Sequence, residues 1–150
     1  MFQFSATVSV VDLEEISDRL EIEALLTRYT RAIDTGEWDL LDDVFTPDAQ
    51  VDYTASGGIE AAYDEVKPWL AEMLPIFPKR MHLIGQVDSQ VDGDTAKVAA
   101  YFYNPMGLPQ EDGTELVVEF GGIYHHDLLR TPQGWRSRAL VEEVVFKRGL

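Results

Sequence analysis

The side chains of this sequence best suited to proton transfer are its 3 histidines, His82, His125 and His126. The ordinary pKa of histidine lies close to neutrality, so an imidazole held by a carboxylate can act as a general base. His125 and His126 are followed by Asp127, which could suggest a metal site. Neighbouring residues of a strand point to opposite faces, however, so these two histidines should not converge on one ion. We therefore expect no metal site.

Tyr29 and Asp34 could contribute a phenol and a carboxylate from one predicted helix. They lie five residues apart, which corresponds to about 140° around an ideal helix. Both can therefore line a pocket only if the helix forms one wall of its mouth. Tyr29 could equally be a core aromatic residue whose hydroxyl group bonds a carbonyl.

The predicted strands carry further candidates. Phe102 and Asn104 alternate onto one strand face and could line the floor of a pocket, although an asparagine before a proline is also an ordinary turn residue. Tyr124 or His126 could point into the same cavity. Arg138 could hold a carboxylate or an enolate, although an ion pair with one of the many acidic residues would also occupy it.

The first half of the chain is expected to hold these side chains on helices. Apolar residues at helical spacing predict a long helix that starts near Asp18 and ends at Gly36; its apolar face comprises Leu20, Ile22, Leu25, Leu26, Tyr29 and Ile33. Asp18 with Glu21 forms a capping pair, and Asp12 with Glu15 offers another that would add a short preceding turn. A second helix is predicted over 38–45, broken by residues 46–48, and a third runs from Asp64 to about residue 75 with Trp69 on its apolar face.

Strands are expected to fill the rest of the chain. They are predicted over 49–54, 79–91, 95–104, 114–130 and 135–147, with a turn at 92–94, a loop at 105–113 and a bulge at Gly121-Gly122. Helices followed by long strands indicate an α+β fold, a single domain over residues 1–150 in which helices pack on one face of a bent antiparallel sheet. The apolar residues 1–11 are interpreted as an arm that packs on this domain or on a second subunit.

Composition narrows the possible partners. The chain has 27 acidic and 12 basic residues, a net charge of −15, which should repel nucleic acid and anionic membrane surfaces. Since cysteine is absent, disulfides and thiolate chemistry are excluded. Residues 1–11 lack the basic residues and the apolar run of a signal peptide, and no segment is long enough to span a membrane, so we expect a cytoplasmic protein.

Several short segments, in order along the chain, resemble the SnoaL-like and scytalone dehydratase-like branch of the nuclear transport factor 2 superfamily. They are Arg28-Tyr29 with Asp34, the Asp48-Ala49 turn before a strand ending at Tyr53, and residues 81–85, 103–106 and 134–136. The resemblance covers most of the chain. It implies a cone-shaped fold in which N-terminal helices pack on a strongly bent antiparallel or mixed sheet that encloses a pocket.

The resemblance also implies roles for individual residues. The matching positions form an Asp34–His82 pair at the pocket wall, in which the carboxylate fixes the histidine tautomer, and Tyr53 matches a second active-site tyrosine beside Tyr29. We predict Tyr29, Asp34 and His82 as catalytic. The residues predicted to bind substrate are Tyr53, Trp69, Phe102, Asn104, Tyr124 and Arg138.

These expectations combine into a cofactor-free dehydratase acting on a small apolar hydroxylated carbonyl compound of polyketide, aromatic or steroid type. His82 would remove a proton beside the carbonyl, and the tyrosines would stabilise the enolate or protonate the departing hydroxyl. Ketosteroid isomerase-like isomerisation and polyketide cyclase-like ring closure begin with the same step and remain alternatives. A non-catalytic assembly module, such as a dioxygenase small subunit, is a third. We expect a homodimer or homotrimer whose apolar outer sheet face is covered by a partner.

Overall fold

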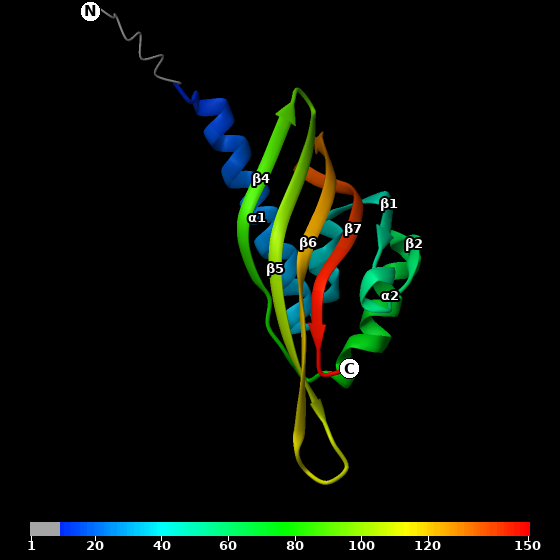
Figure 1. Cartoon of the computed structure of the whole chain (residues 1–150). Helices are drawn as coiled ribbons and strands as arrows, with labels where there is room; N and C mark the ends of the chain where they lie inside the picture. The colour runs from blue at the N-terminus through cyan, green and yellow to red at the C-terminus, as the bar shows by residue number, and fades with distance from the viewer. Residues whose placement is uncertain (1–9) are drawn as a thin grey trace, which may run out of the picture.

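The computed structural model describes residues 10–150 and shows helices packed on a curled sheet (Figure 1). The predicted N-terminal arm falls mainly on residues 1–9, outside the described part, and its last residues Val10 and Val11 are exposed. No helix within residues 10–150 combines the length and the apolar character needed to cross a bilayer.

The first helix, α1 (Leu13–Thr35), begins a turn earlier than its main predicted start. Asp12 caps it, because its Oδ1 accepts the Glu15 N–H at 2.8 Å. Gly36 ends it in the left-handed region at φ +74°, as predicted. The proposed Asp18–Glu21 cap is wrong, since Asp18 lies inside the helix and is buried. Leu20, placed on the apolar face from its spacing, is exposed.

The segment after α1 is less helical than predicted. A 3-10 helix, η1 (Trp38–Asp43), replaces the second helix, and Val44 and Phe45 are buried beyond its end. The predicted break at residues 46–48 is a register shift inside strand β1 (Phe45–Asp52) where it pairs with the last strand. Then follow η2 (Thr54–Ser56), β2 (Glu60–Ala62), α2 (Tyr63–Met73) and η3 (Leu74–Ile76).

The remaining strands form an antiparallel meander. They are β3 (Lys79–Arg80), β4 (Leu83–Asp92), β5 (Thr95–Pro109), β6 (Glu115–Thr131) and β7 (Gly134–Arg148). The predicted 79–91 strand is interrupted at residues 81 and 82. The predicted loop at 105–113 is mostly strand, because β5 and β6 stay paired from Thr95↔Leu129 to Pro109↔Glu115. Asn104 is therefore a strand residue and not a turn residue.

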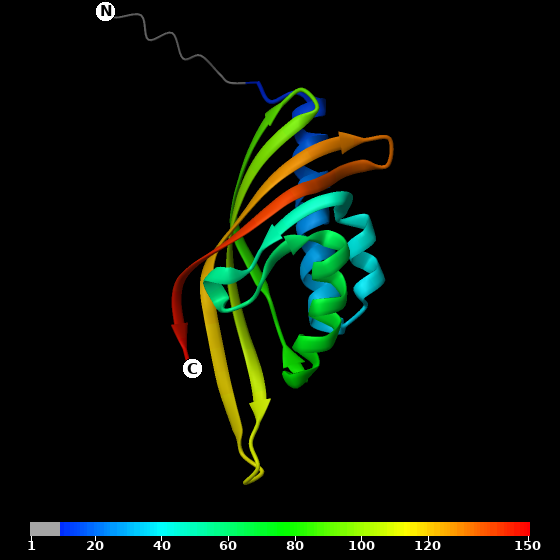
Figure 2. The same cartoon turned by 90° about the vertical axis from the view of Figure 1, so that its right-hand side faces the viewer.

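The sheet is mixed, with the order β2-β1-β7-β6-β5-β3 and β4 beside β5. β1 runs parallel to β7, and the other pairs are antiparallel. Figure 2 shows the sheet curling around α1 and α2 without closing. The predicted bulge is present, as the register between β6 and β7 shifts at Gly121/Gly122. A Cβ on Gly122 would lie 1.8 Å from the Glu143 carbonyl oxygen, so only glycine fits there.

A part-buried ion pair ties α1 to the sheet. Arg130 donates to both Asp18 oxygens, at 2.7 and 3.0 Å, and the Trp135 indole N–H donates to Asp18 Oδ1 at 3.0 Å. The guanidinium also lies 4.4 Å from the Trp135 ring centroid. The Arg130 hydrogen bonds lower the pKa of Asp18, with help from Trp135 and against the effect of burial. The α+β class is as predicted, and this contact fixes how α1 crosses β6 and β7.

Candidate active site

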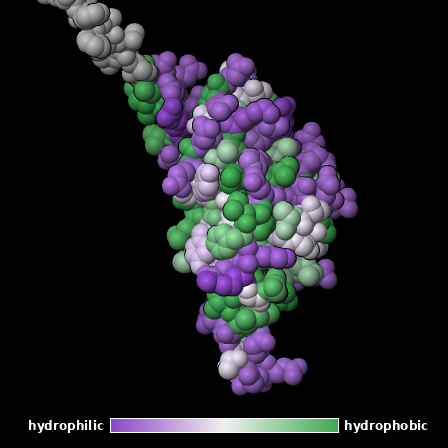
Figure 3. All heavy atoms as spheres, viewed as in Figure 1, coloured by the Kyte–Doolittle hydropathy of each residue, from purple (hydrophilic) through white to green (hydrophobic). Residues whose placement is uncertain are grey.

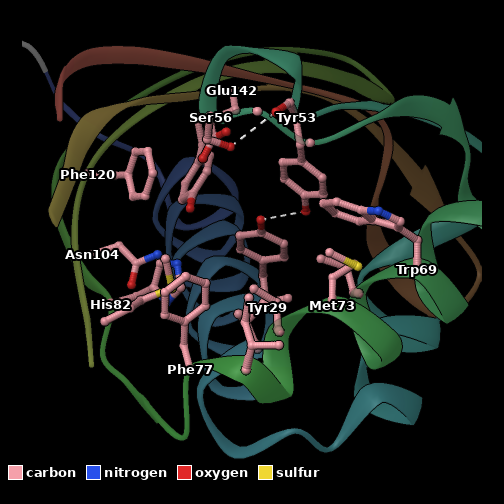
Figure 4. Close-up of a pocket in the computed structure, with 18 of the residues that line it drawn as sticks. Tyr29, Tyr53, Ser56, Trp69, Met73, Phe77, His82, Asn104, Phe120 and Glu142 are labelled. Atoms are coloured by element: carbon pink, nitrogen blue, oxygen red, sulfur yellow. Dashed lines mark hydrogen bonds between the residues drawn. The ribbon is translucent and has the colours of Figure 1, made fainter. Parts of the chain in front are cut away.

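A cavity of about 240 Å³ lies between the concave sheet face and the helices α1 and α2 (Figure 4). Aromatic and aliphatic side chains make most of its wall. Its polar groups come from six elements or connections: α1, the segment around η2, the β3–β4 break, β5, β6 and β7. They are Tyr29, Tyr53, Ser56, His82, Asn104, Tyr124 and Glu142.

Asp34 and His82 form the predicted pair. Asp34 lies in the last turn of α1, and His82 lies in the two-residue break between β3 and β4. Asp34 Oδ1 is 2.6 Å from His82 Nδ1, and Asp34 Oδ2 accepts the His82 backbone N–H at 2.8 Å. The His82 side chain is only 3% exposed and that of Asp34 is 22% exposed. Asp34 does not line the cavity; it holds the histidine from behind.

The charge state of Asp34 fixes the histidine tautomer. Burial alone would raise the pKa of Asp34, but the hydrogen bonds from the His82 ring and backbone outweigh it, and the pKa is lowered. An ionised carboxylate can only accept hydrogen bonds, so Nδ1 of His82 carries the hydrogen. Nε2, on the ring edge away from Asp34, is then free to accept a proton.

Arg80 fastens the elements that carry this pair. Its guanidinium donates to the Ile33 carbonyl at the end of α1 at 2.9 Å, and to the Leu74 and Phe77 carbonyls at 3.0 and 2.8 Å. A cation at a helix C-terminus also interacts favourably with the helix dipole. Arg80 was not predicted, since nothing in the local sequence indicates that carbonyl groups from two segments converge on it.

Tyr29 and Tyr53 share a hydrogen bond between their hydroxyl oxygens at 2.7 Å. Both side chains are buried, and burial raises the pKa of each phenol well above its usual value. The pair has two hydroxyl hydrogens, of which one lies between the oxygens. The other can be donated to a ligand or to the neighbouring Tyr124 hydroxyl, which also interacts with Tyr29. The pair can therefore supply one neutral donor.

The other predicted residues fall into three groups. Trp69, Asn104 and Tyr124 line the cavity, and Trp69 stacks on Tyr53 with centroids 6.2 Å apart. Phe102 lies behind the wall, stacked on Tyr124 at 4.1 Å, so it supports the cavity without lining it. Arg138 is exposed beside a separate hollow near Gln90 and Asp127. Arg138, predicted to bind the substrate, does not line this cavity, because the register shift between β6 and β7 at Asp127/Leu128 skips this residue and interrupts the alternation of β7.

The sequence profile of the SnoaL-like domain matches residues 14–141. The chain belongs to the SnoaL-like family. Among its relatives, an uncharacterized protein of Mycobacterium tuberculosis is 45% identical over 141 residues, covering 93% of this chain and 94% of the relative.

Several solved structures share the fold of this SnoaL-like domain. The Kfla4162 protein of Kribbella flavida aligns with a TM-score of 0.81 at 25% identity, over 91% of this chain and 95% of its own. A candidate scytalone dehydratase of Novosphingobium aromaticivorans aligns at 0.79 and 15% identity, over 90% and 89%. The hexachlorocyclohexane dehydrochlorinase LinA type 2 aligns at 0.79 and 18% identity, over 93% of both chains. The last two likenesses establish the fold alone.

Sequence reasoning missed one ionisable group of this SnoaL-like cavity, Glu142 on β7. It is 8% exposed and lines the cavity with Ser56 of η2. Leu140, Glu142 and Val144 alternate onto one face of the strand. The two apolar residues indicate that this face points inward, so the acid between them could have been recognised as buried.

The two adjacent histidines of the SnoaL-like sheet face opposite sides, as strand alternation predicts. His125 is exposed and lies 2.6 Å from Glu143, whereas His126 is buried with Nδ1 2.9 Å from Ser137 Oγ. Burial lowers the pKa of His126 to about 3. His126 does not line the cavity, so it belongs to the core behind Tyr29 and Tyr124.

Proposed function

We propose that this protein is a cofactor-free lyase, a dehydratase that removes water from a small, apolar, hydroxylated carbonyl compound. The observation that carries the proposal is the double contact between Asp34 and His82, which holds one ring nitrogen and leaves the other as a base at the cavity wall. A positioned base of this kind contributes typically 10²–10⁴ in rate.

The reaction would begin with proton abstraction next to the carbonyl group. Nε2 of His82 takes the proton, and Asp34 stabilises the imidazolium that forms. The electron pair of the broken C–H bond moves toward the carbonyl oxygen. The free hydroxyl hydrogen of the Tyr29–Tyr53 pair can be donated to that oxygen as its negative charge develops. Loss of the neighbouring hydroxyl group then gives the unsaturated product.

The cavity wall supports a ring-sized apolar substrate of polyketide, aromatic or steroid type. Trp69, Phe77 and Phe120 present aromatic surface, and Leu70, Met73 and Met106 add aliphatic surface. The volume of about 240 Å³ lies just below the usual range for ligand sites, which begins at about 300 Å³, so it favours the smallest of these substrates. Two of the structurally similar proteins are named for loss of water and of hydrogen chloride, which agrees with elimination started by a base.

The test uses 4-hydroxy-4-phenylbutan-2-one, a β-hydroxy ketone that loses water to a conjugated enone with strong ultraviolet absorbance. Wild-type protein should accelerate this loss and should incorporate deuterium beside the carbonyl in D₂O. His82→Ala should lower both rates by about 10²–10⁴, while Arg138→Gln, outside the cavity, should keep both.

Isomerisation or ring closure would share the deuterium incorporation, so exchange without water loss would favour those alternatives over a dehydratase. Equal activity of His82→Ala and wild type would contradict the role of His82 as the general base.

A further inference from the structure

Glu142 is a buried acid that the proposed mechanism has not used. Glu142 pairs with Tyr124 of β6 across the sheet. Its chain neighbour Val141 pairs with Asp52 of β1 on the other side. Its carboxyl group points into the cavity near Ser56 and Tyr53 (Figure 4). Oε2 is buried and has no hydrogen-bond partner within residues 10–150. An unpartnered polar atom in an apolar cavity is costly unless a ligand satisfies it.

The surroundings of Glu142 favour its protonated form. Burial raises the pKa of Glu142 from its usual value near 4.5 to about 7; the Asp52 carboxylate adds to the shift and the Ser56 hydroxyl opposes it. The other ionisable groups facing it are Tyr29 of α1, Tyr53 after β1 and Tyr124 of β6, all neutral phenols. No basic side chain is among the residues lining the cavity except His82.

The tyrosines are poor sources of a transferred proton by comparison. Burial raises the pKa of each of the three phenols well above its usual value, so a tyrosinate in the cavity is strongly disfavoured even when Glu142 is neutral. The Tyr29–Tyr53 pair can donate a hydrogen bond at little cost but can surrender a proton only at a high one. A departing hydroxide needs a full proton, because it is a poor leaving group.

Resting on the proposed elimination, we propose that Glu142 is the general acid of the cavity, which protonates the departing hydroxyl group while His82 acts as the base. The two groups reach the cavity from different elements, Glu142 from β7 and His82 from the β3–β4 break, with the tyrosine pair lining the wall as well (Figure 4).

The step balances without any co-reactant. The C–H bond breaks and its proton goes to Nε2 of His82, while its electron pair becomes the new C=C bond. The C–O bond breaks and its electron pair leaves with oxygen, which takes the Glu142 proton and departs as water. The enzyme is left with a His82 imidazolium and a Glu142 carboxylate. Once the product leaves, His82 gives a proton to solvent and Glu142 takes one back.

The experiment compares two substrates whose leaving groups differ in their need for a proton. Alongside the β-hydroxy ketone above, 4-acetoxy-4-phenylbutan-2-one loses acetate, which departs as an anion without needing a proton. Glu142→Gln should lower the ratio of water loss to acetate loss by about 10²–10⁴, the usual effect of a positioned acid. His82→Ala should lower both rates together and leave the ratio unchanged.

Glu143→Gln is the matched control, because this neighbouring residue points to the outer face and contacts His125; its ratio should equal that of wild type. Glu142→Asp, which keeps an acid with a shorter reach, should recover part of the ratio lost in Glu142→Gln. An unchanged ratio in Glu142→Gln, checked as folded by circular dichroism, would overturn the proposal.

Failure of the proposed function would look different. If wild-type protein eliminates neither group and exchanges no deuterium, the proposed dehydratase function fails. Carbon-13 titration of the labelled glutamate carboxyl groups then measures the pKa of Glu142 independently of activity. The resonance lost in Glu142→Gln should titrate close to pH 7 in wild type. A Glu142 pKa at the ordinary glutamate value, about 4.3, would overturn the assignment of Glu142 as the general acid.

Discussion

Asp34 contacts His82 with both carboxylate oxygens, one at ring Nδ1 at 2.6 Å and the other at the backbone N–H at 2.8 Å. The backbone contact prevents the carboxyl group from rotating freely, so the oxygen that faces the ring is fixed. This arrangement makes Asp34 a positioning residue that selects the tautomer of His82.

Asp34→Asn should therefore reverse the tautomer. The backbone N–H of His82 requires the amide oxygen, so the amide NH₂ faces Nδ1 and makes it an acceptor, which places the ring hydrogen on Nε2. Turnover should fall by roughly 10²–10⁴ although the ring stays in place. Single-turnover kinetics measures the fall, and nitrogen-15 shifts of the ring report the tautomer. Near-normal activity with Nε2 protonated would contradict the assigned base.

Tyr29→Phe should reduce turnover and leave ground-state ligand affinity nearly unchanged, because the phenol acts on charge that develops in the transition state. Loss of one such donor costs about 10²–10³ in rate. The Tyr53 hydroxyl loses its buried partner, so the free energy of unfolding should drop by about 1 kcal/mol. Urea denaturation and single-turnover kinetics separate the two effects. A proportional loss of affinity and rate would indicate a binding role only.

Asp18→Asn should destabilise the protein without touching the cavity. The variant loses the charge of a buried carboxylate that Arg130 and Trp135 contact, and it leaves the half-buried guanidinium poorly paired. We expect a loss of about 2–3 kcal/mol. Asp127→Asn is the control, because its pair with Lys97 is largely exposed and should contribute under about 1 kcal/mol. Equal melting temperatures of the two variants would contradict a stabilising contact of Asp18 with Arg130 and Trp135.

Stability should depend on pH in two opposite ways. The folded pKa of His126, about 3, is below its unfolded value, so the unfolded chain binds a proton first. Relative to His126→Gln, wild type should lose stability as pH falls from about 6.5 toward 3. The folded pKa of Glu142 is raised, so relative to Glu142→Gln wild type should lose stability as pH rises from 4.5 to about 7.

Urea denaturation across pH 3–8 measures both differences, and taking each variant against wild type prevents the two trends from cancelling. A difference that is flat with pH for either variant would show that its residue titrates at the ordinary value.

The outer sheet face should be covered by a second copy of the chain. Leu83, Tyr101 and Phe146 are each about half exposed there, with Val117 and Val141 nearby, and Figure 3 shows apolar patches among hydrophilic residues in the middle and lower part of this face. Phe146 packs over Gly121, where a Cβ would lie 2.1 Å from its ring. Exposed apolar surface of this kind indicates an interface. Light scattering should give a dimer or trimer, and Tyr101→Lys with Phe146→Lys should give a monomer; a wild-type mass of one chain would refute it.

Local sequence patterns determined the two long helices, most of the strands and the family of this protein. Helical spacing and Gly36 defined where α1 lies and ends, strand alternation separated His125 from His126, and the glycine pair marked the bulge in β6. These features depend on backbone geometry within a few residues, which the sequence encodes directly.

Only the tertiary structure decided which polar residues are buried and what they contact. The local sequence predicts Asp18 as a helix cap. In the structure its carboxylate is buried, because it accepts hydrogen bonds from Arg130 and Trp135, more than a hundred residues later in the sequence. Arg138 and Glu142 lie four positions apart on one strand, but the register of β7 and the curl of the sheet point the first outward and the second into the cavity. Depth of burial is set by long-range packing, and it is burial that raises the pKa of Glu142.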